Sequence, residues 1–263
     1  MLAAQADEAG QSYLQNRVFV VFRCAWSAKG PKDMFKMRAY GEGHDGSSWE
    51  VVMKQARGFG QKKDDQYTSF TELEAHEKRG IDYDFSALDR GSAVAIVAPH
   101  GGWIEYGTSQ LATAAAGDDF SLYLFEGLKP KRPHRELHIG SEYFDEKQFV
   151  QLVTKAQIVI GMHGRADRDD PETIWLRSLG KELRDAIGLA LEAADFKAIT
   201  SGHRLPGEHK NNICNRGIGR AGVQLELPKT LRDALIANAE RRVLFSGAVR
   251  KAVLEHLGKP GIA

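Results

Sequence analysis

Cysteine is scarce in this sequence, which holds only Cys24 and Cys214 among 263 residues. Two such distant cysteines match neither a disulfide framework nor a Cys-x-x-Cys metal pair, so we expect two free thiols in a reducing compartment. A strong charge of one sign is also missing, because 36 Lys and Arg residues nearly balance 35 Asp and Glu residues. This balance argues against a nucleic-acid-binding protein, which usually carries a marked basic excess.

Long apolar runs are missing as well. The run at residues 18–22 is far too short to span a bilayer, and residues 1–10 carry acids but no basic segment of the kind that begins a secretory signal. We therefore expect a cytoplasmic protein without a membrane partner. What remains is ordinary globular composition, with 42% hydrophobic and 27% charged residues, which is enough for one sizeable core.

Residues 1–65 differ in pattern from the rest of the chain. They hold one strand-like run, VFVVF, and then Gly-rich and charge-rich segments that predict loops. We expect residues 1–65 to form an N-terminal extension or a small accessory segment. Residues 66–263 are expected to form the main domain.

From residue 66 onward, predicted strands alternate with predicted helices. Apolar runs with β-branched residues predict strands at 91–100, 120–127, 136–140, 157–164 and 221–228. Helical spacing predicts helices at 69–79, 108–117, 144–156 and 178–194, and two helical segments within 229–258. This alternation predicts an α/β sandwich with a largely parallel or mixed sheet.

Two of the predicted strands end in the same way, with a histidine followed by glycine. His100 ends one apolar run, Glu105 follows it within a glycine-rich turn, and His163 ends another run. Ligands of α/β folds bind beyond the carboxyl ends of the strands, and two imidazoles with one carboxylate are a common ligand set for catalytic zinc. The pattern fits a zinc site here and fits ordinary hydrogen-bonded or surface histidines equally well, and the spacing alone does not separate the two.

The strand predicted at 221–228 carries a further acid. Gln224 and Glu226 alternate with apolar residues and therefore share one face of the strand. That face is either exposed to solvent or part of the active site, with Glu226 as general base for a metal-activated water. Arg216 and Arg220 in the preceding glycine-rich loop either hold a substrate carboxylate or oxyanion, or lie on the surface.

Five segments of the chain also carry a resemblance to a known family. They are VAIVAPHGGWIEYGTSQLA, DDFSLYLFEGLK, ELHIGSEYFDE, IGMHG and NICNRGIGRAGVQLELPKTLR, and the resemblance covers residues 66–235. In this order they resemble the phage-associated poly-γ-glutamate hydrolase family. The resemblance implies a zinc carboxypeptidase-like fold, a three-layer sandwich with a mixed central β-sheet flanked by helices. It also implies a zinc peptidase that cleaves the γ-amide bonds of anionic poly-γ-glutamate.

The resemblance also implies roles for single residues. In the matching motifs, His100, Glu105 and His163 fall on the metal ligands. Glu226 falls where a carboxypeptidase-like site needs its general base, which takes a proton from the attacking water and delivers it to the leaving amine. The implied cofactor is therefore Zn²⁺.

Three further residues are implicated in substrate contact. Asn215 and Arg216 of the segment NICNR are implied to bind substrate or to stabilise the transition state. Trp103 stands where the family pattern has a glycine, so we expect its bulk to contact substrate and to narrow the site. No role is assigned to the remaining histidines, among them His134 and His138.

Two other functions stay open on the sequence alone. An N-formylglutamate or other N-acyl amino-acid amidohydrolase has a similar zinc architecture, and the bulk of Trp103 favours such a small substrate. A catalytically idle, phage-derived binding module is the alternative of another class, against which the retained Glu226 argues. The expected partner is thus poly-γ-glutamate or a small N-acyl amino acid, with no nucleic acid and with phage lysis as one route of release.

Overall fold

The computed structural model describes residues 21–22, 36–42, 48–54, 65–202 and 208–258. The chain divides into two compact units, Met1–Phe59 and Gly60–Ala263. In the first unit, an antiparallel sheet is formed by β1 (Val21–Phe22), β2 (Lys36–Glu42) and β3 (Ser48–Lys54). Only two residues of the predicted strand VFVVF lie within the described part of the chain, and the predicted division after residue 65 stays a prediction.

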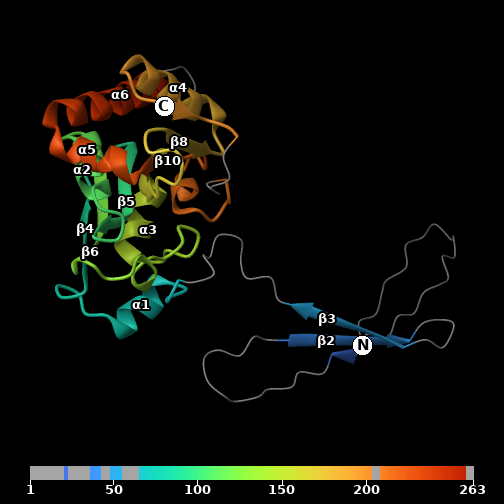
Figure 1. The fold of residues 1–263 in the computed structure, drawn as a ribbon. Helices are drawn as coiled ribbons and strands as arrows, with labels where there is room; N and C mark the ends of the chain where they lie inside the picture. The colour runs from blue at the N-terminus through green and yellow to red at the C-terminus, as the bar shows by residue number, and fades with distance from the viewer. Residues whose placement is uncertain (1–20, 23–35, 43–47, 55–64, 203–207, 259–263) are drawn as a thin grey trace, which may run out of the picture. The chain divides into compact units, whose positions relative to one another are not determined.

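A seven-stranded sheet forms the centre of the second unit (Figure 1). Its strands are β4 (Tyr83–Leu88), β5 (Val94–Gly102), β6 (Ser121–Gly127), β7 (Ile158–Arg165), β8 (Ile174–Ser178), β9 (Ala198–Ile199) and β10 (Val223–Pro228). Their order is β4-β6-β5-β7-β10-β8-β9. The four strands β6, β5, β7 and β10 are parallel, whereas β4 and β8 pair antiparallel with β6 and β10. The predicted mixed sheet is therefore confirmed, although β4, β8 and β9 were not predicted.

Helices cover both faces of this sheet. They are α1 (Phe70–His76), α2 (Thr108–Ala116), α3 (Lys147–Lys155), α4 (Lys181–Ala193), α5 (Lys229–Ala237) and α6 (Ala239–Leu257). One hydrophobic cluster contains residues of α2, α4, α5 and α6, and a second contains residues of α1 and α3. In β5, Ile96 belongs to the first cluster and Val97 to the second, as the alternation of side chains along a strand requires. Both faces of β5 are thus buried, which explains its continuous apolar run.

The local signals mark some helix boundaries correctly and one strand wrongly. Ser69 caps α1 by accepting a hydrogen bond from the Glu72 amide, and Asn238 separates α5 from α6. The strand predicted at 136–140 is wrong, because Glu136 is the last residue of a short 3₁₀ helix, η1 (His134–Glu136), and residues 137–140 form a turn and a loop. Its alternating apolar residues Leu137 and Ile139 are buried in the second cluster without pairing to a strand.

The order in which the chain adds strands to the sheet reverses at β5. From β5 it passes through α2 to β6 on one side, and from β6 through α3 to β7 on the other side. Since α2 and α3 pack on opposite faces, the connections diverge and open a crevice at the carboxyl ends of β5 and β7, where α/β folds bind their ligands. Among the helices that the structure describes, none combines the length and apolar character needed to span a bilayer.

Candidate metal centre

A tight turn at the end of β5 presents both His100 and Glu105. The pairing of β5 with β6 shifts register between Ala98 and Gly101, and such a bulge changes the direction of the side chains that follow. The Glu105 amide donates to the His100 carbonyl oxygen at 2.9 Å, and Thr108 Oγ1 donates to the Glu105 carbonyl oxygen at 2.9 Å. These hydrogen bonds close the turn and hold the two side chains near each other.

The neighbouring strands β7 and β10 supply His163 and Glu226. These two residues are direct partners in the parallel register, so their side chains lie on the same face of the sheet. Met162 and Leu225, one position earlier in each strand, pack into the cluster that contains α2. His163 and Glu226 therefore point to the opposite face, which α1 and α3 cover.

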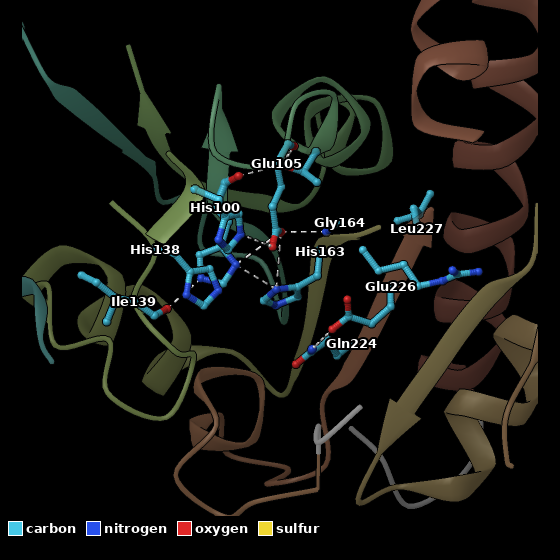
Figure 2. Close-up of polar contacts among 12 residues, drawn as sticks. His100, Glu105, His138, Ile139, His163, Gly164, Gln224, Glu226 and Leu227 are labelled. Carbon is cyan, nitrogen blue, oxygen red and sulfur yellow. Dashed lines mark hydrogen bonds and ion pairs between the residues drawn. The ribbon is translucent and has the colours of Figure 1, made fainter. Parts of the chain in front are cut away.

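The side chains of His100, Glu105 and His163 converge at the strand ends (Figure 2). Nδ1 of His100 lies 3.2 Å from Nδ1 of His163 and 3.3 Å from Oε2 of Glu105, and the remaining distance between His163 Nδ1 and Glu105 Oε2 is 4.0 Å. Ligand atoms about 2.1 Å from a tetrahedral zinc ion lie about 3.4 Å from one another. The three atoms thus have the spacing and the chemistry of a zinc site, and all three residues are buried.

Hydrogen bonds and charge prepare these groups for a metal. Nε2 of His100 lies 2.7 Å from the Ile139 carbonyl oxygen and donates to it, which leaves the lone pair on Nδ1. Oε2 of Glu105 accepts the Gly164 amide at 2.7 Å. Burial by itself raises the pKa of Glu105, but the neighbouring histidines, above all His100, outweigh it and hold this pKa well below its usual range. Glu105 is therefore a carboxylate, the form that binds a cation.

A second group of potential ligands shares Glu105. Glu105, His134 and His138 each offer one ligand atom, and these atoms lie within 4.8 Å of one another. Nε2 of His134 is 3.3 Å from Oε1 of Glu105. The ring of His138 stacks on that of His134 at a centroid distance of 4.4 Å and lies 4.0 Å from that of His100. The His-x-x-x-His spacing of HRELH is the sequence signal that would have found this pair.

Both groups line a cavity of about 530 Å³. Four basic residues also contribute to its wall: Arg165, Arg168, Lys229 and Arg232. Burial lowers the pKa of the Arg232 guanidinium, but its ordinary pKa is so high that the group stays charged. The wall thus holds four cations beside the carboxylates of Glu105, Glu142 and Glu226. Such a cavity suits a ligand that carries carboxylates.

Glu226 lies on the cavity wall beside the predicted metal ligands. Its Oε1 accepts a hydrogen bond from Gln224 Nε2, and Gln224 Oε1 in turn accepts from Asn212 Nδ2 at 2.9 Å. All three side chains are buried and line the cavity. The sequence left open whether the face of β10 with Gln224 and Glu226 is exposed to solvent or part of a site. In the structure this face lines the cavity. The contribution of Asn212 had no signal in the sequence.

Arg216 lies away from its predicted position in the site. Its guanidinium donates to three backbone carbonyl oxygens at 2.7–2.8 Å, those of Asn211, Glu142 and Phe144. Neither Arg216 nor Asn215 is among the described residues that line the cavity. The side-chain amide of Asn215 donates through Nδ2 to the His209 carbonyl oxygen at 3.0 Å. In the structure Arg216 thus holds backbone segments together, whereas the sequence predicted that it contacts substrate.

Arg165 is the arginine that the structure does bring to the site. It follows His163 by two residues at the end of β7 and lines the cavity. Its Nη2 donates to Asp170 Oδ2 at 2.9 Å, and its guanidinium carbon lies 4.0 Å from the centre of the Trp175 ring. Its Nε is buried and has no hydrogen-bond partner among the described residues, so this N–H is not used within the described part of the protein. Its position directly after IGMHG was the available sequence signal.

Trp103 also lies apart from the cavity. Its side chain is 50% exposed and stacks on the ring of Tyr106 at a centroid distance of 5.3 Å. It is not one of the described residues that line the cavity. We expected Trp103 to narrow the site, but the structure places its side chain outside the described cavity.

Comparisons with known proteins agree on one family. The model of the poly-γ-glutamate hydrolase family matches residues 67–248. In Bacillus subtilis (strain 168), the SPbeta prophage-derived UPF0714 protein YoqZ is 34% identical over 184 residues, which are 69% of this chain and 62% of YoqZ. The UPF0714 protein YndL of the same strain is 34% identical over 176 residues, 65% of this chain and 67% of YndL. The chain thus spans less than two thirds of YoqZ.

Solved structures show the same relationship. A bacteriophage poly-γ-glutamate hydrolase is similar with a TM-score of 0.68 and 29% identity, covering 74% of this chain and 99% of the other. A zinc-free structure of YndL is similar with a TM-score of 0.67 and 29% identity, covering 73% of this chain and 98% of the other. Because the family match extends over most of the chain and includes the converging residues from His100 to Glu226, this chain belongs to the poly-γ-glutamate hydrolase family.

Proposed function

We propose that this protein is a zinc-dependent hydrolase that cleaves the γ-glutamyl amide bonds of poly-γ-glutamate. The observation that carries the proposal is the convergence of His100, Glu105 and His163, with Glu226 beside them in one basic cavity. Membership in the family supports the reaction and the polymeric substrate. The similar bacteriophage structure is itself a poly-γ-glutamate hydrolase.

His100 and His163, through their Nδ1 atoms, and Glu105, through Oε2, would hold the Zn²⁺. When bound, Zn²⁺ supplies Lewis acidity, which polarises an amide carbonyl and makes water a better nucleophile near neutral pH. The His100 hydrogen bond to Ile139 keeps that imidazole in the tautomer with a lone pair on Nδ1. The description of one YndL structure as zinc-free supports zinc as the metal.

Glu226 is the proposed general base. Its carboxylate takes a proton from the attacking water and returns it to the leaving amine, a role worth about 10²- to 10⁴-fold in rate. Gln224 orients this carboxylate through a side-chain hydrogen bond. The Asn212 amide holds Gln224 in turn, so that the position of Glu226 does not depend on substrate.

Arg165 is the proposed donor to the substrate. Its buried Nε–H can hydrogen-bond the oxyanion that forms at the carbonyl, or a carboxylate next to the scissile bond. Arg168 and Lys229 on the same wall would attract the carboxylates that every residue of the polymer carries. Arg216 and Trp103 are left out of this active site because neither lines the described cavity.

The bulk of Trp103 was the feature of this chain that favoured the amidohydrolase alternative. Trp103 packs on Tyr106 instead, and a cavity of about 530 Å³ accommodates more than one N-formyl amino acid. We therefore favour the polymer over a small N-acyl amino acid. A cytoplasmic location, with release on phage lysis, stays a prediction.

We also propose that residues 66–263 form the hydrolase domain and that residues 1–65 are accessory. The family match begins at residue 67, which supports this division. A chain that lacks residues 1–59 is expected to fold and to keep its turnover, as measured by thermal unfolding and by polymer shortening. The deletion must end before Asp65, because its carboxylate lies 2.9 Å from His138 Nδ1. Insoluble or inactive protein would contradict the accessory role.

Polymer shortening tests the proposed function directly. The purified chain is loaded with Zn²⁺, incubated with poly-γ-glutamate, and the polymer length is followed by gel filtration. Shortening is expected, and removal of the metal by a chelator is expected to abolish it until Zn²⁺ is restored. Poly-α-glutamate of equal length is the matched control and should stay intact. Hydrolysis of N-formylglutamate alone, with intact polymer, would favour the amidohydrolase, and metal-bound protein without any turnover would favour a binding module.

A further inference from the structure

We propose that Glu105, His134 and His138 form a second metal site, so that the Glu105 carboxylate bridges two divalent cations. The inference rests on the first metal site of the proposed function, since Glu105 is a ligand in both. It assigns a binding role to two histidines that the proposed reaction does not use. The class of ligand is a first-row divalent cation such as Zn²⁺ or Co²⁺, which imidazole and carboxylate ligands suit.

The two oxygens of Glu105 face different groups. Oε2 lies 3.3 Å from Nδ1 of His100 and accepts the Gly164 amide, whereas Oε1 lies 3.3 Å from Nε2 of His134. A carboxylate whose oxygens face separate sets of ligands can hold two metal ions, which in two-metal enzymes lie about 3.5–4 Å apart. His134 and His138 therefore stand on the side of Glu105 that the first site leaves unused.

A buried carboxylate fixes the tautomer of His138. Nδ1 of His138 lies 2.9 Å from Oδ2 of Asp65, whose side chain is only 1% exposed. With its proton on Nδ1, the ring carries its lone pair on Nε2, the form in which histidine ligates a metal. Metal-binding histidines typically donate their other N–H to a carboxylate or a carbonyl oxygen. Asp65 thus gives His138 the same support that the Ile139 carbonyl oxygen gives His100.

The local backbone brings His134 to the same place. The amide of His138 donates to the His134 carbonyl oxygen at 3.1 Å, so this turn stacks the two rings with centroids 4.4 Å apart. The His134 side chain is 36% exposed and lies on the cavity wall, which leaves the site open to an ion from solvent. Because this site is more open than the first and shares the charge of Glu105, we expect it to bind its metal more weakly.

Metal titration of the full chain tests the second site without relying on activity. Metal-depleted protein is titrated with Co²⁺ and followed by its visible absorption, and the bound metal is counted by elemental analysis after equilibrium dialysis against Zn²⁺. Wild-type protein is expected to bind two ions per chain, the second at least tenfold more weakly. His134→Ala is expected to bind one ion, with the tight step unchanged. His163→Ala is expected to lose the tight step, and Glu105→Gln to weaken both steps.

An exposed histidine away from the cavity serves as the control. His76→Ala removes an imidazole that contacts the Glu72 carbonyl oxygen and the Tyr67 ring, and it should keep two ions per chain. His134→Ala is preferred to His138→Ala because the half-exposed His134 contributes less to packing. Thermal unfolding of each variant verifies that it folds, and His134→Gln replaces His134→Ala if the latter does not.

The outcomes separate the second site from the proposed function. One ion per chain at saturating Zn²⁺, or two ions in His134→Ala, would overturn the second site. If the polymer is still shortened with one ion bound, the hydrolase function stands without it. Two ions that fall to one in His134→Ala, in a protein that does not shorten the polymer, would support the second site and refute the function.

Discussion

The carboxyl ends of β5, β7 and β10 and the segment around η2 (Ile213–Arg216) are both rich in polar side chains, but they use them differently. At the strand ends, Glu226 and Arg165 line the cavity. Around η2, Arg216 donates its hydrogen bonds to backbone carbonyl oxygens of a loop that has no sheet partner. A buried backbone carbonyl outside regular structure needs a donor, and a nearby arginine supplies it. The same residue type is thus available to a ligand in one region and committed to the fold in the other.

The largest effect is expected at the strand end of β10. Glu226→Gln removes the proposed general base and should lower kcat by about 10²- to 10⁴-fold. The amide keeps the shape of the side chain, so zinc content and thermal unfolding should stay close to wild type. Polymer shortening and elemental analysis on one preparation measure both. Glu240→Gln, in the first turn of α6, is the matched control and should have no effect. Near-normal turnover of Glu226→Gln would remove this residue from the mechanism.

Substitution of Arg165 tests the other strand end. Arg165→Ala removes the buried Nε–H donor, and we expect kcat to fall by about 10²- to 10³-fold, as for the loss of an oxyanion donor. Steady-state kinetics with a defined γ-glutamyl oligomer measure kcat and KM separately. Arg165→Lys should rescue little, because an ammonium group does not reproduce the planar fork that Asp170 and Trp175 position. An unchanged kcat would show that Arg165 only supports the fold.

For Arg216 we expect a substitution to lower stability and to leave kcat nearly unchanged, the opposite of what we expect for Arg165. Arg216→Ala leaves three carbonyl oxygens without their charged donor, and it should lower the free energy of unfolding by about 3 kcal/mol. The kcat of the folded fraction should stay within about threefold of wild type, since the side chain lies outside the cavity and supplies no transition-state interaction. Urea unfolding and kinetics at low temperature separate the two effects. A large fall in kcat with unchanged stability would restore the substrate role predicted from the sequence.

The smallest effect is expected at Trp103. Trp103→Gly removes a ring that stacks on Tyr106 outside the described cavity, so KM for the polymer should change by less than about threefold, a difference below 1 kcal/mol. Comparison of KM for the polymer and for N-formylglutamate measures any shift in preference. A large fall in KM for only one of the two substrates would show that Trp103 reaches the bound ligand. Trp103 would then belong to the site and not only to the surface.

Much of the fold could be predicted because its signals are local. Continuous apolar runs predicted β5 and β7, and the residues at their ends became site candidates because parallel strands of an α/β sheet share one binding edge. The strand predicted at 136–140 is wrong although it rests on the same kind of signal, an apolar pattern, that predicted β5 correctly. Alternating apolar residues indicate burial, and burial against α/β layers does not require pairing in a sheet.

The sequence by itself determined the strands β5, β6, β7 and β10, the helices of the second unit and the candidate ligands at the strand ends, since each depends on residues close together in the chain. Only the tertiary structure decided that β7 and β10 pair in the register that sets His163 beside Glu226. It also decided that Arg165 and not Arg216 reaches the cavity, and that Asp65 supports His138 across 73 positions of sequence. Strand order and loop packing fix these distances, and no local pattern encodes them because they depend on contacts formed throughout the folded domain.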